Sequence, residues 1–299
     1  MTKKKLLITG AGGFLGWNIC RTATREYSVT GVYRSRPVAL DDVQREQCDI
    51  TDFRSLGELF LRIQPDAVIH AAAESKPDAC QEHPDVTKRI NVDAALAIAG
   101  LCSDRGIPCA FTSSDLVFDG KNPPYDETRA PSPVSIYGEQ KTAAEAGMRD
   151  RYGGVIICRM PLMYGDVPPL AKSFIQPFVS SILAGKELRL FSDEFRTPVS
   201  GGTAARGLLL ALDQTCGILH LGGSERVSRY DFGVRLARAL GRPGTQLAAI
   251  SRKEVAFRAP RPADVSLDSR KAMALGYKPL PIDEELNALE CVKKVLQCS

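Results

Sequence analysis

Two kinds of hydrophobic pattern alternate along the first half of the chain. Short apolar runs rich in Val and Ile occupy residues 6–9, 29–33, 67–71, 107–112 and 155–158. Stretches in which apolar residues recur with helical spacing lie between them, at residues 15–25, 53–63, 85–105 and 137–152. Continuous apolar runs are typical of strands buried on both faces, and their alternation with helices predicts parallel strands joined by right-handed crossovers. The pattern therefore predicts an α/β fold, a Rossmann-type doubly wound parallel sheet with helices on both faces.

This rhythm ends near residue 161, where prolines become frequent. A strand-like run at 217–221 is expected to return to the sheet, and helices are expected at 230–240 and 283–296. We therefore predict a Rossmann domain over residues 1–160, to which residues 201–223 return. Residues 161–200 and 224–299 are expected to form a smaller C-terminal lobe that binds the substrate.

The composition is ordinary for a globular protein and indicates no disorder. The chain has 299 residues, of which 44% are hydrophobic and 25% are charged, and its net charge is +4. Lys and Arg do not alternate with aromatic residues in any run, so we expect no nucleic-acid partner. A small phosphorylated molecule would suit this mild positive charge equally well.

Several features favour a soluble, cytoplasmic protein. The first strand is expected to begin at Lys5, which leaves no room for a signal peptide ahead of it. No apolar run approaches the roughly 20 residues that span a bilayer, so we expect no membrane partner. The nine cysteines form no C-x-x-C pair and their number is odd, so reduced thiols are expected. The three histidines, His70, His83 and His220, lack metal-ligand spacing, so no metal site is expected and His70 receives no catalytic role.

Glycines follow the first strand with the spacing G-x-x-G-x-x-G, at Gly10, Gly13 and Gly16, with Phe14 and Leu15 inside the motif. The first glycine permits a tight turn, the second lets the backbone approach a pyrophosphate, and the third lets the helix pack closely on the strand. The N–H groups at the start of the helix then hold the anion. The motif predicts dinucleotide binding; the alternative is a tight turn between strand and helix that binds nothing.

The end of the second strand distinguishes between the two nicotinamide cofactors. NAD binders usually carry an acidic residue there for the ribose hydroxyls, whereas this chain carries Arg34 and Arg36 and no acid. Guanidinium groups match the geometry of a 2′-phosphate, so we expect NADP(H) rather than NAD(H). The alternative is that both arginines are solvated loop residues.

Other strand ends are expected to line the same groove, because the carboxyl ends of parallel strands meet at one edge of the sheet. Asp49 and Ile50 end the third strand region and could meet the adenine. Ala71, Ala72 and Ala73 end the fourth, where small side chains let a cofactor lie close.

A catalytic pair is indicated by the pattern Y-x-x-x-K at Tyr137 and Lys141. Residues four apart share one face of a helix, and an ammonium near a phenol lowers its pKa, which makes it a usable acid or base. Ser113 and Ser114, which follow the fifth strand, compete for the role of a hydroxyl that binds a substrate carbonyl. The alternative is that these hydroxyls only satisfy backbone groups.

Together these motifs resemble the extended short-chain dehydrogenase/reductase family, which carries the glycine motif, a Ser or Thr after the fifth strand and Y-x-x-x-K in this order. The resemblance covers essentially the whole chain. It implies a catalytic triad of Ser114, Tyr137 and Lys141, the last two also in contact with the cofactor. It further implies that Asn91 matches a helix asparagine of the family and contributes to cofactor binding.

Within this family the chain most resembles the dTDP-4-dehydrorhamnose reductase subfamily. The segment 113–120, S-S-D-L-V-F-D-G, is similar to its S-T-D-Y-V-F-D-G, and the segment 261–268 is similar to its R-P-x-x-x-x-L-D. One departure is Asn18, where some members carry a Glu linked to a magnesium-bound dimer, so the sequence leaves the oligomeric state open, a dimer included. The segments 70–78 and 121–125 also resemble the regulatory β subunit of methionine adenosyltransferase, which belongs to the same subfamily.

The resemblance implies NADPH-dependent reduction of a 4-keto nucleotide sugar. NADPH would supply hydride and Tyr137 the proton, while Ser114 orients the carbonyl. We expect the substrate to contact four residues: Ser114, Asp115, Arg196 and Arg261, the two arginines meeting its phosphates.

Two alternatives remain. One is a non-catalytic NADP-binding regulatory subunit, which the methionine adenosyltransferase resemblance implies. The other is a nucleotide-sugar epimerase, which Arg34 and Arg36 disfavour because epimerases generally retain NAD.

Overall fold

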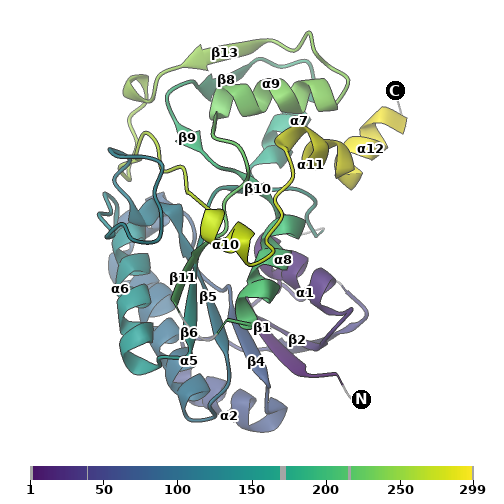
Figure 1. The fold of residues 1–299 in the computed structure, drawn as a ribbon. Coiled ribbons are helices and arrows are strands. Elements are labelled where there is room, and N and C mark those ends of the chain that lie inside the picture. The colour runs from purple at the N-terminus through teal and green to yellow at the C-terminus, as the bar shows by residue number, and fades with distance from the viewer. Residues whose placement is uncertain (1–2, 39, 169–172, 215–216, 298–299) are drawn as a thin grey trace.

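Seven parallel strands form one central sheet in the computed structural model, which describes residues 3–38, 40–168, 173–214 and 217–297. The strand order is β11-β6-β5-β4-β1-β2-β3, and every neighbouring pair is parallel (Figure 1). This order, with the first strand central, is that of a doubly wound Rossmann-type sheet, and it confirms the predicted fold class. The strands are β1 (Lys5–Thr9), β2 (Ser28–Tyr33), β3 (Val43–Gln47), β4 (Ala67–His70), β5 (Cys109–Ser114), β6 (Val155–Met160) and β11 (Gly217–His220).

Helices cover both faces of this sheet. Alternate residues of β1 show why: Leu6 and Ile8 pack in the core cluster on one face and Leu7 packs in the cluster on the other. The first cluster also takes in residues of α1 (Phe14–Ala23) and α8 (Gly201–Leu212), and the second takes in residues of α2 (Phe53–Ile63), α5 (Ala94–Ser103) and α6 (Ile136–Arg151). The sheet is therefore buried on both sides, as its continuous apolar strands predict.

Two predicted boundaries differ from the structure in ways that affect the site. The fifth strand, predicted to end at residue 112, extends to Ser114 because Ser113 and Ser114 pair with Arg159 and Met160 of β6. Both serines are thus part of the strand rather than of the loop that follows it. The helix predicted over 85–105 is divided into α4 (Pro84–Lys88), a π-helical turn η1 (Arg89–Asp93) and α5.

Two other helices also differ from their prediction. The helix expected over 283–296 is split into α11 (Ile282–Ala288) and α12 (Glu290–Gln297), because Leu289 between them has extended dihedrals. Helix α8 was not predicted as a helix. Its small buried residues, among them Ala204 and Ala205, pack in the core cluster that also contains residues of α1.

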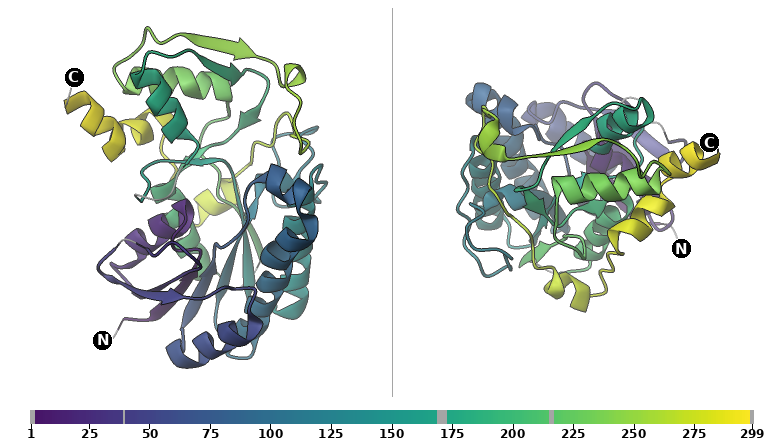
Figure 2. Two further views of the ribbon diagram at one scale, coloured as in Figure 1. Left: turned by 180° about the vertical axis from the view of Figure 1, so that it is seen from behind. Right: turned by 90° about the horizontal axis from the view of Figure 1, so that it is seen from above.

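A smaller group of elements lies beyond the carboxyl ends of the strands, at the top of Figure 1 and of the left view in Figure 2. It has its own core, which includes Tyr164, Phe232 and Leu286. Its elements are α7 (Ile175–Leu183), β8 (Leu188–Phe191), β9 (Phe195–Arg196), β12 (Val227–Ser228), α9 (Arg229–Ala239), β13 (Leu247–Ile250), η3 (Arg252–Glu254), α11 and α12. Short elements complete the described chain: α3 (Pro77–Glu82), η2 (Asp115–Val117), β7 (Met163–Tyr164), β10 (Val199–Ser200) and α10 (Arg270–Ala274).

The division of the chain into a Rossmann domain (1–160 and 201–223) and a lobe (161–200 and 224–299) stays a proposal. Strand β11 joins the central sheet next to β6. Ala272 and Tyr277 pack in the sheet's core cluster although the proposal assigns them to the lobe.

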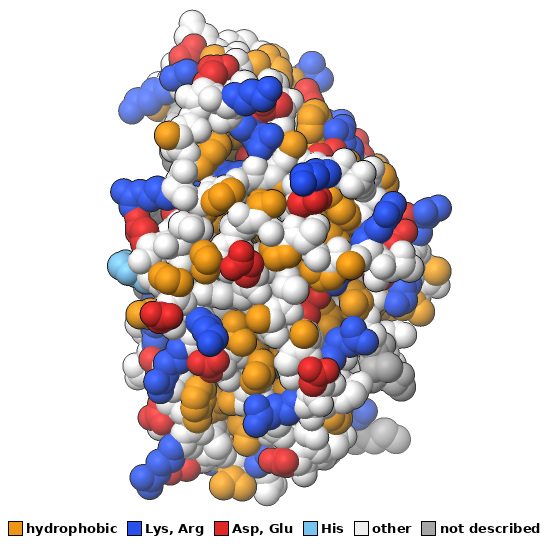
Figure 3. Space-filling view, turned by 90° about the vertical axis from the view of Figure 1, so that its left-hand side faces the viewer, with side chains coloured by type: hydrophobic (Ala, Val, Ile, Leu, Met, Phe, Trp, Pro, Cys, Tyr) orange, Lys and Arg blue, Asp and Glu red, His pale blue; other side chains and the backbone are white. Residues whose placement is uncertain are grey.

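Neither the charge distribution on the face shown in Figure 3 nor the cysteines of the described residues indicate a further site. On the face that carries α6, acidic and basic side chains are interspersed (Figure 3). Among the described ranges no helix combines the length and the apolar content that crossing a membrane requires. Seven cysteines in these ranges are free thiols, whereas Cys216 and Cys298 lie outside them.

Candidate active site

A cavity of about 490 Å³ opens at the carboxyl ends of the central strands. This size lies within the range of small-molecule and cofactor sites. The cavity is lined by all but one of the residues predicted to bind the cofactor, namely Gly10, Gly13, Phe14, Leu15, Gly16, Arg34, Arg36, Asp49, Ile50, Ala71, Ala72, Ala73, Tyr137 and Lys141. The exception is Asn91.

The glycine turn between β1 and α1 leaves room for an anion. Gly10 has φ +73°, and a Cβ atom there would lie 2.8 Å from the backbone of Ala72, so the position requires glycine. Helix α1 begins after Gly13, which offers no side chain to cap it, and its first turn contains no acidic residue. The first N–H groups of the helix therefore lack an internal acceptor and face a cavity, which is the arrangement that binds a phosphate.

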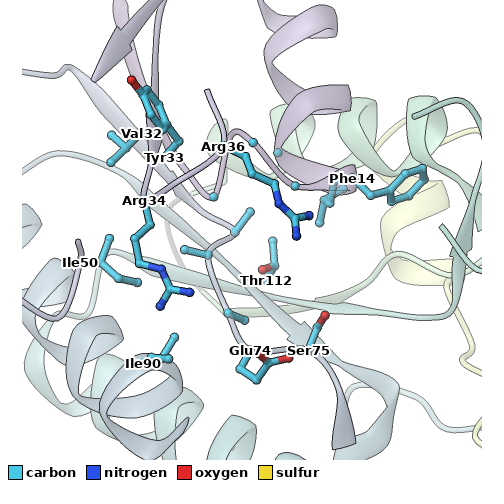
Figure 4. A pocket seen from close by; sticks show the side chains of 18 of the residues that line it. Phe14, Val32, Tyr33, Arg34, Arg36, Ile50, Glu74, Ser75, Ile90 and Thr112 are labelled. Carbon is cyan, nitrogen blue, oxygen red and sulfur yellow. The ribbon is translucent and has the colours of Figure 1, made fainter. Parts of the chain in front are cut away.

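Two arginines at the end of β2 extend into the cavity (Figure 4). Arg34 is close enough to Asp49 to contribute to the lowered pKa of that carboxyl, although the main cause is a hydrogen bond from the Thr51 backbone N–H. Asp49 is therefore charged and already holds Thr51. The guanidinium groups supply positive charge at the rim where a Rossmann fold places the adenosine ribose.

Tyr137 and Lys141 lie one turn apart on α6, whose N-terminus is capped by the Ser135 side chain. Both side chains are buried yet line the cavity. The Lys141 ammonium donates a hydrogen bond of 2.9 Å to the carbonyl oxygen of Thr112 and lies 5.9 Å from the centre of the Tyr137 ring. The structure thus brings the predicted phenol and ammonium together at one wall of the cavity.

Burial dominates the pKa values of this pair. It lowers the pKa of Lys141 to about 8, while the Glu145 carboxylate acts in the opposite direction. Burial raises the pKa of Tyr137 above its ordinary value, against a hydrogen bond with Ser114 that lowers it. The expected net lowering of the Tyr137 pKa is therefore wrong, because desolvation of the phenolate dominates and the nearby Asp115 charge adds to it. Tyr137 is a protonated acid at neutral pH.

The two candidate serines have different partners. The Ser113 hydroxyl donates a hydrogen bond of 2.5 Å to Glu145, which also forms a fully buried ion pair with Arg159. Ser113 lines the cavity, but its hydroxyl hydrogen is used in the bond to Glu145 and is not available to a substrate carbonyl. Ser114 accepts a hydrogen bond from the Leu116 backbone and donates one of 3.2 Å to Asp115.

Asp115 and Arg196 are buried and contact each other. Their carboxylate and guanidinium are 2.9 Å apart, an ion-pair contact that joins η2 to strand β9 of the lobe, although the Asp115 oxygen receives no well-aligned hydrogen bond. Arg196 also lies 3.6 Å from Glu194, and its Nε has no hydrogen-bond partner. Arg261 stacks on Phe257 at 4.4 Å. None of the four residues predicted to bind substrate, Ser114, Asp115, Arg196 and Arg261, is among those that line the cavity.

Asn91 lies behind the cavity wall, with 1% of its surface exposed. Its side chain accepts a hydrogen bond from the backbone N–H of Glu74 and donates to the carbonyl oxygen of the same residue. It therefore holds the loop after β4 rather than pointing into the cavity.

Several lining residues were not predicted. They are Gly12, Val32, Tyr33, Ser35, Cys48, Glu74, Ser75, Lys76, Ile90, Thr112, Met160 and Met163, whereas Ser113 was one of the two candidate hydroxyls. Most adjoin predicted residues at the ends of β2, β4 and β5, so the rule that strand ends share one edge could have extended those segments. Met160 and Met163 follow the same rule at the end of β6. Ile90 had no such signal, because it comes from the π-helical turn.

Among the described residues no cluster of three or more His, Cys, Asp or Glu side chains could hold a metal ion.

Comparison with known proteins shows what this chain is similar to. The RmlD substrate binding domain family matches residues 4–295. The probable low-salt glycan biosynthesis reductase Agl14 of Haloferax volcanii is 32% identical over 290 residues, which cover 95% of this chain and 96% of that protein. Methionine adenosyltransferase 2 subunit beta of Bos taurus is 30% identical over 287 residues, which cover 91% and 83% of the two chains.

Among solved structures, dTDP-4-dehydrorhamnose reductase from Bacillus anthracis in complex with NADP has a TM-score of 0.85 and covers 100% of both chains. Its sequence identity is 22%, so this likeness concerns the fold alone.

Proposed function

Because the chain belongs to the RmlD substrate binding domain family, we propose that it is an NADPH-dependent oxidoreductase that reduces a 4-keto nucleotide sugar. One observation carries this proposal: a single cavity contains the glycine turn, two arginines and the Tyr137–Lys141 pair. The reductase relative from Haloferax volcanii and the NADP-bound structure of similar fold support it.

The residues around the cavity fit this cofactor. The uncapped start of α1 suits the pyrophosphate, and Arg34 and Arg36 suit the 2′-phosphate. Ala71, Ala72 and Ala73 offer small side chains against which a flat ring system can lie. When bound, NADPH supplies the hydride that reduces the carbonyl carbon.

The chain's own residues supply the proton that the reduced carbonyl oxygen requires. Tyr137, which is protonated at neutral pH because burial raises its pKa, donates its proton to the oxygen of the reduced carbonyl. Lys141 is held by the Thr112 carbonyl oxygen, and its positive charge favours the phenolate that forms at Tyr137 after the transfer. Ser114 orients the carbonyl oxygen, for which its hydroxyl must turn away from Asp115.

The substrate side rests on charged residues of the lobe. Arg261 and Arg196 each have a buried Nε without a partner, so each retains a donor for a phosphate oxygen or a sugar hydroxyl. Asp115, which pairs with Arg196, would contact the sugar in the same region.

A second candidate function is favoured by one observation, the 30% identity to methionine adenosyltransferase 2 subunit beta. In that case the chain would bind NADP(H) and a protein partner and catalyse no reduction. An intact Tyr137–Lys141 pair does not distinguish the two, since the pair lines the cofactor cavity and could contact bound NADP(H) in either case.

The test is oxidation of NADPH by the purified protein in the presence of dTDP-4-dehydrorhamnose and other 4-keto nucleotide sugars. Turnover is expected, and Tyr137→Phe should lower kcat by about a hundredfold or more with an NADPH Kd within about twofold of the unmodified chain, because a general acid contributes that much to the rate. Tyr152→Phe, at the far end of the same helix, is the matched control and should retain full activity.

Unchanged turnover in Tyr137→Phe would reject the assigned acid. NADPH binding without oxidation by any 4-keto nucleotide sugar, together with co-purification of an added methionine adenosyltransferase catalytic subunit, would instead support the regulatory function.

A further inference from the structure

Gln140, inside the Y-x-x-x-K motif, is a buried amide whose polar atoms all have partners. Its Oε1 accepts a hydrogen bond of 2.8 Å from Asn91, and its Nε2 donates bonds of 3.0 Å to the carbonyl oxygen of Pro84 and to the Thr87 hydroxyl. Only 6% of Gln140 is exposed. A buried amide with every group satisfied is strongly held in one orientation.

The directions of these bonds follow from groups that can act in only one way. The Pro84 carbonyl can only accept, so the Gln140 atom facing it is the donor Nε2. The Thr87 hydroxyl gives its hydrogen to the His83 carbonyl, so it too accepts from Gln140. Oε1 is left to face Asn91, which must therefore present its Nδ2.

The same logic continues from Asn91 to the loop after β4. The Glu74 backbone N–H can only donate, so it bonds Asn91 Oδ1 at 2.9 Å, and the Glu74 carbonyl accepts from Nδ2 at 3.1 Å. Neither amide can be flipped without placing two donors or two acceptors together. Each hydrogen bond on the path from Glu74 through Asn91 and Gln140 to α4 thus has a fixed donor and a fixed acceptor.

This path connects the two sides of the cavity. At one end is α6, which carries Tyr137 and Lys141; at the other is the loop 71–76, every residue of which lines the cavity. Asn91 lies in the π-helical turn η1, whose Ile90 also faces the cavity (Figure 4). π-helical turns within helices occur frequently at functional sites.

We propose that Gln140 is a positioning residue for the cofactor: through Asn91 it fixes the distance between the loop 71–76 and the helix that carries Tyr137 and Lys141. This rests on the proposed binding of NADPH. Without Gln140, Asn91 stays bonded to Glu74 but loses its bond to α6. The loop is then no longer tied to that helix and must be ordered when the cofactor binds. That ordering reduces affinity even though Gln140 does not touch the cofactor.

The test uses Gln140→Met, which keeps the size of the side chain and removes its hydrogen bonds. The Kd for NADPH, measured by isothermal titration calorimetry on the whole chain, is expected to rise about tenfold, which corresponds to about 1.4 kcal/mol. Thr87→Val is the matched control: it removes one partner of Gln140 but leaves the bond to Asn91. Thr87→Val should lower Tm but leave the Kd for NADPH within about twofold of the unmodified chain. If Gln140 had only a structural role, the two substitutions would affect the Kd alike.

Asn91→Leu is the second test variant, and it should raise the Kd for NADPH at least as much as Gln140→Met does. Because Gln140 acts on the loop only through Asn91, adding Gln140→Met to Asn91→Leu should change the Kd by less than about twofold. Independent, multiplying effects of the two substitutions would overturn the proposed path. If Gln140→Met does not fold, an unaltered Kd in Asn91→Leu overturns it equally.

The two levels of inference fail in different ways. NADPH binding that Gln140→Met and Asn91→Leu leave unchanged rejects the positioning role alone. No NADPH binding by the unmodified chain rejects the proposed cofactor and this role together.

Discussion

Two buried histidines should make the folded protein sensitive to mild acid. Burial lowers the pKa of His70 to about 3, with the nearby Lys141 charge acting in the same direction, and lowers the pKa of His220 to about 4, with help from Arg159. The ordinary value is 6.5. Both rings are fully buried. Below pH 6.5 these two histidines are therefore protonated in the unfolded chain but stay neutral in the folded chain.

Hydrogen bonds explain why neither ring accepts a second proton. The Thr9 hydroxyl accepts from the backbone N–H groups of Ala71 and Ala72, so its own hydrogen goes to His70 Nδ1, which must be an acceptor. His220 has the opposite tautomer: its Nδ1 donates to the Tyr125 carbonyl, and its Nε2 faces the Arg159 guanidinium at 3.4 Å. Protonation would replace an acceptor by a donor in both places.

The magnitude follows from these values. With an unfolded pKa of 6.5 and a folded pKa of about 3 or 4, linkage gives about 2 kcal/mol of lost stability per histidine at pH 5, or roughly 4 kcal/mol for the two. The stabilisation is complete above pH 6.5 and is lost as pH falls toward the folded values. Carboxylates with lowered pKa add their losses at lower pH, while Asp115, whose pKa is raised by burial, acts weakly in the opposite sense.

Urea unfolding at pH 7.5 and pH 5 measures this loss. His70→Asn and His220→Asn, each of which keeps a polar group in place of the ring, should each remove about half of the pH-dependent difference. His83→Asn, on an exposed residue, is the control and should leave it unchanged. Equal unfolding free energies at the two pH values in the unmodified chain would refute the assignment of neutral, buried rings.

Two further changes test other parts of the structure. Replacing Arg34 and Arg36 with Ser should raise the Kd for NADPH at least about tenfold while that for NADH changes little, because each charge-assisted bond to a phosphate is worth about 1.5–3 kcal/mol; an equal effect on both cofactors would contradict the 2′-phosphate contact. Glu145→Gln leaves Arg159 buried without its charge partner and should lower the free energy of unfolding by about 3 kcal/mol or more. The loss is measured as a lower urea midpoint, and Glu139→Gln on the exposed side of α6 is the control.

Local sequence patterns determined which parts of the fold could be predicted. In each βα unit of the first half the strand and the helix that follows it are neighbours in the sequence, so periodicity and the glycine turn identify them. The family match over residues 4–295 confirms the resemblance drawn from those motifs. The π-helical turn at Asn91 could not be predicted, because the extra residue in that turn is stabilised by bonds to Glu74 and Gln140, which are distant along the chain.

The cofactor side of the proposed site depends on local sequence patterns, whereas the substrate side depends on contacts between distant residues. The cofactor cavity is built from backbone at strand ends, and each strand end is visible in the sequence as the last residues of an apolar run. The proposed substrate side depends on side chains that meet only through packing of the lobe, such as Asp115 with Arg196. No periodic signal marks these pairs.

This difference bears on why the relatives of this chain include both a probable reductase and a methionine adenosyltransferase subunit. The elements that hold a dinucleotide are local and persist as long as the strands and the glycine turn persist. Under the proposed function, turnover further depends on lobe residues such as Arg196, which contacts Asp115 at the carboxyl end of β5. A chain can therefore lose or change its substrate through a few lobe residues while its cofactor cavity, its glycine turn and its Y-x-x-x-K motif remain intact. The decisive evidence on function thus comes from measurements on the lobe side of the cavity, with NADPH binding as the shared baseline.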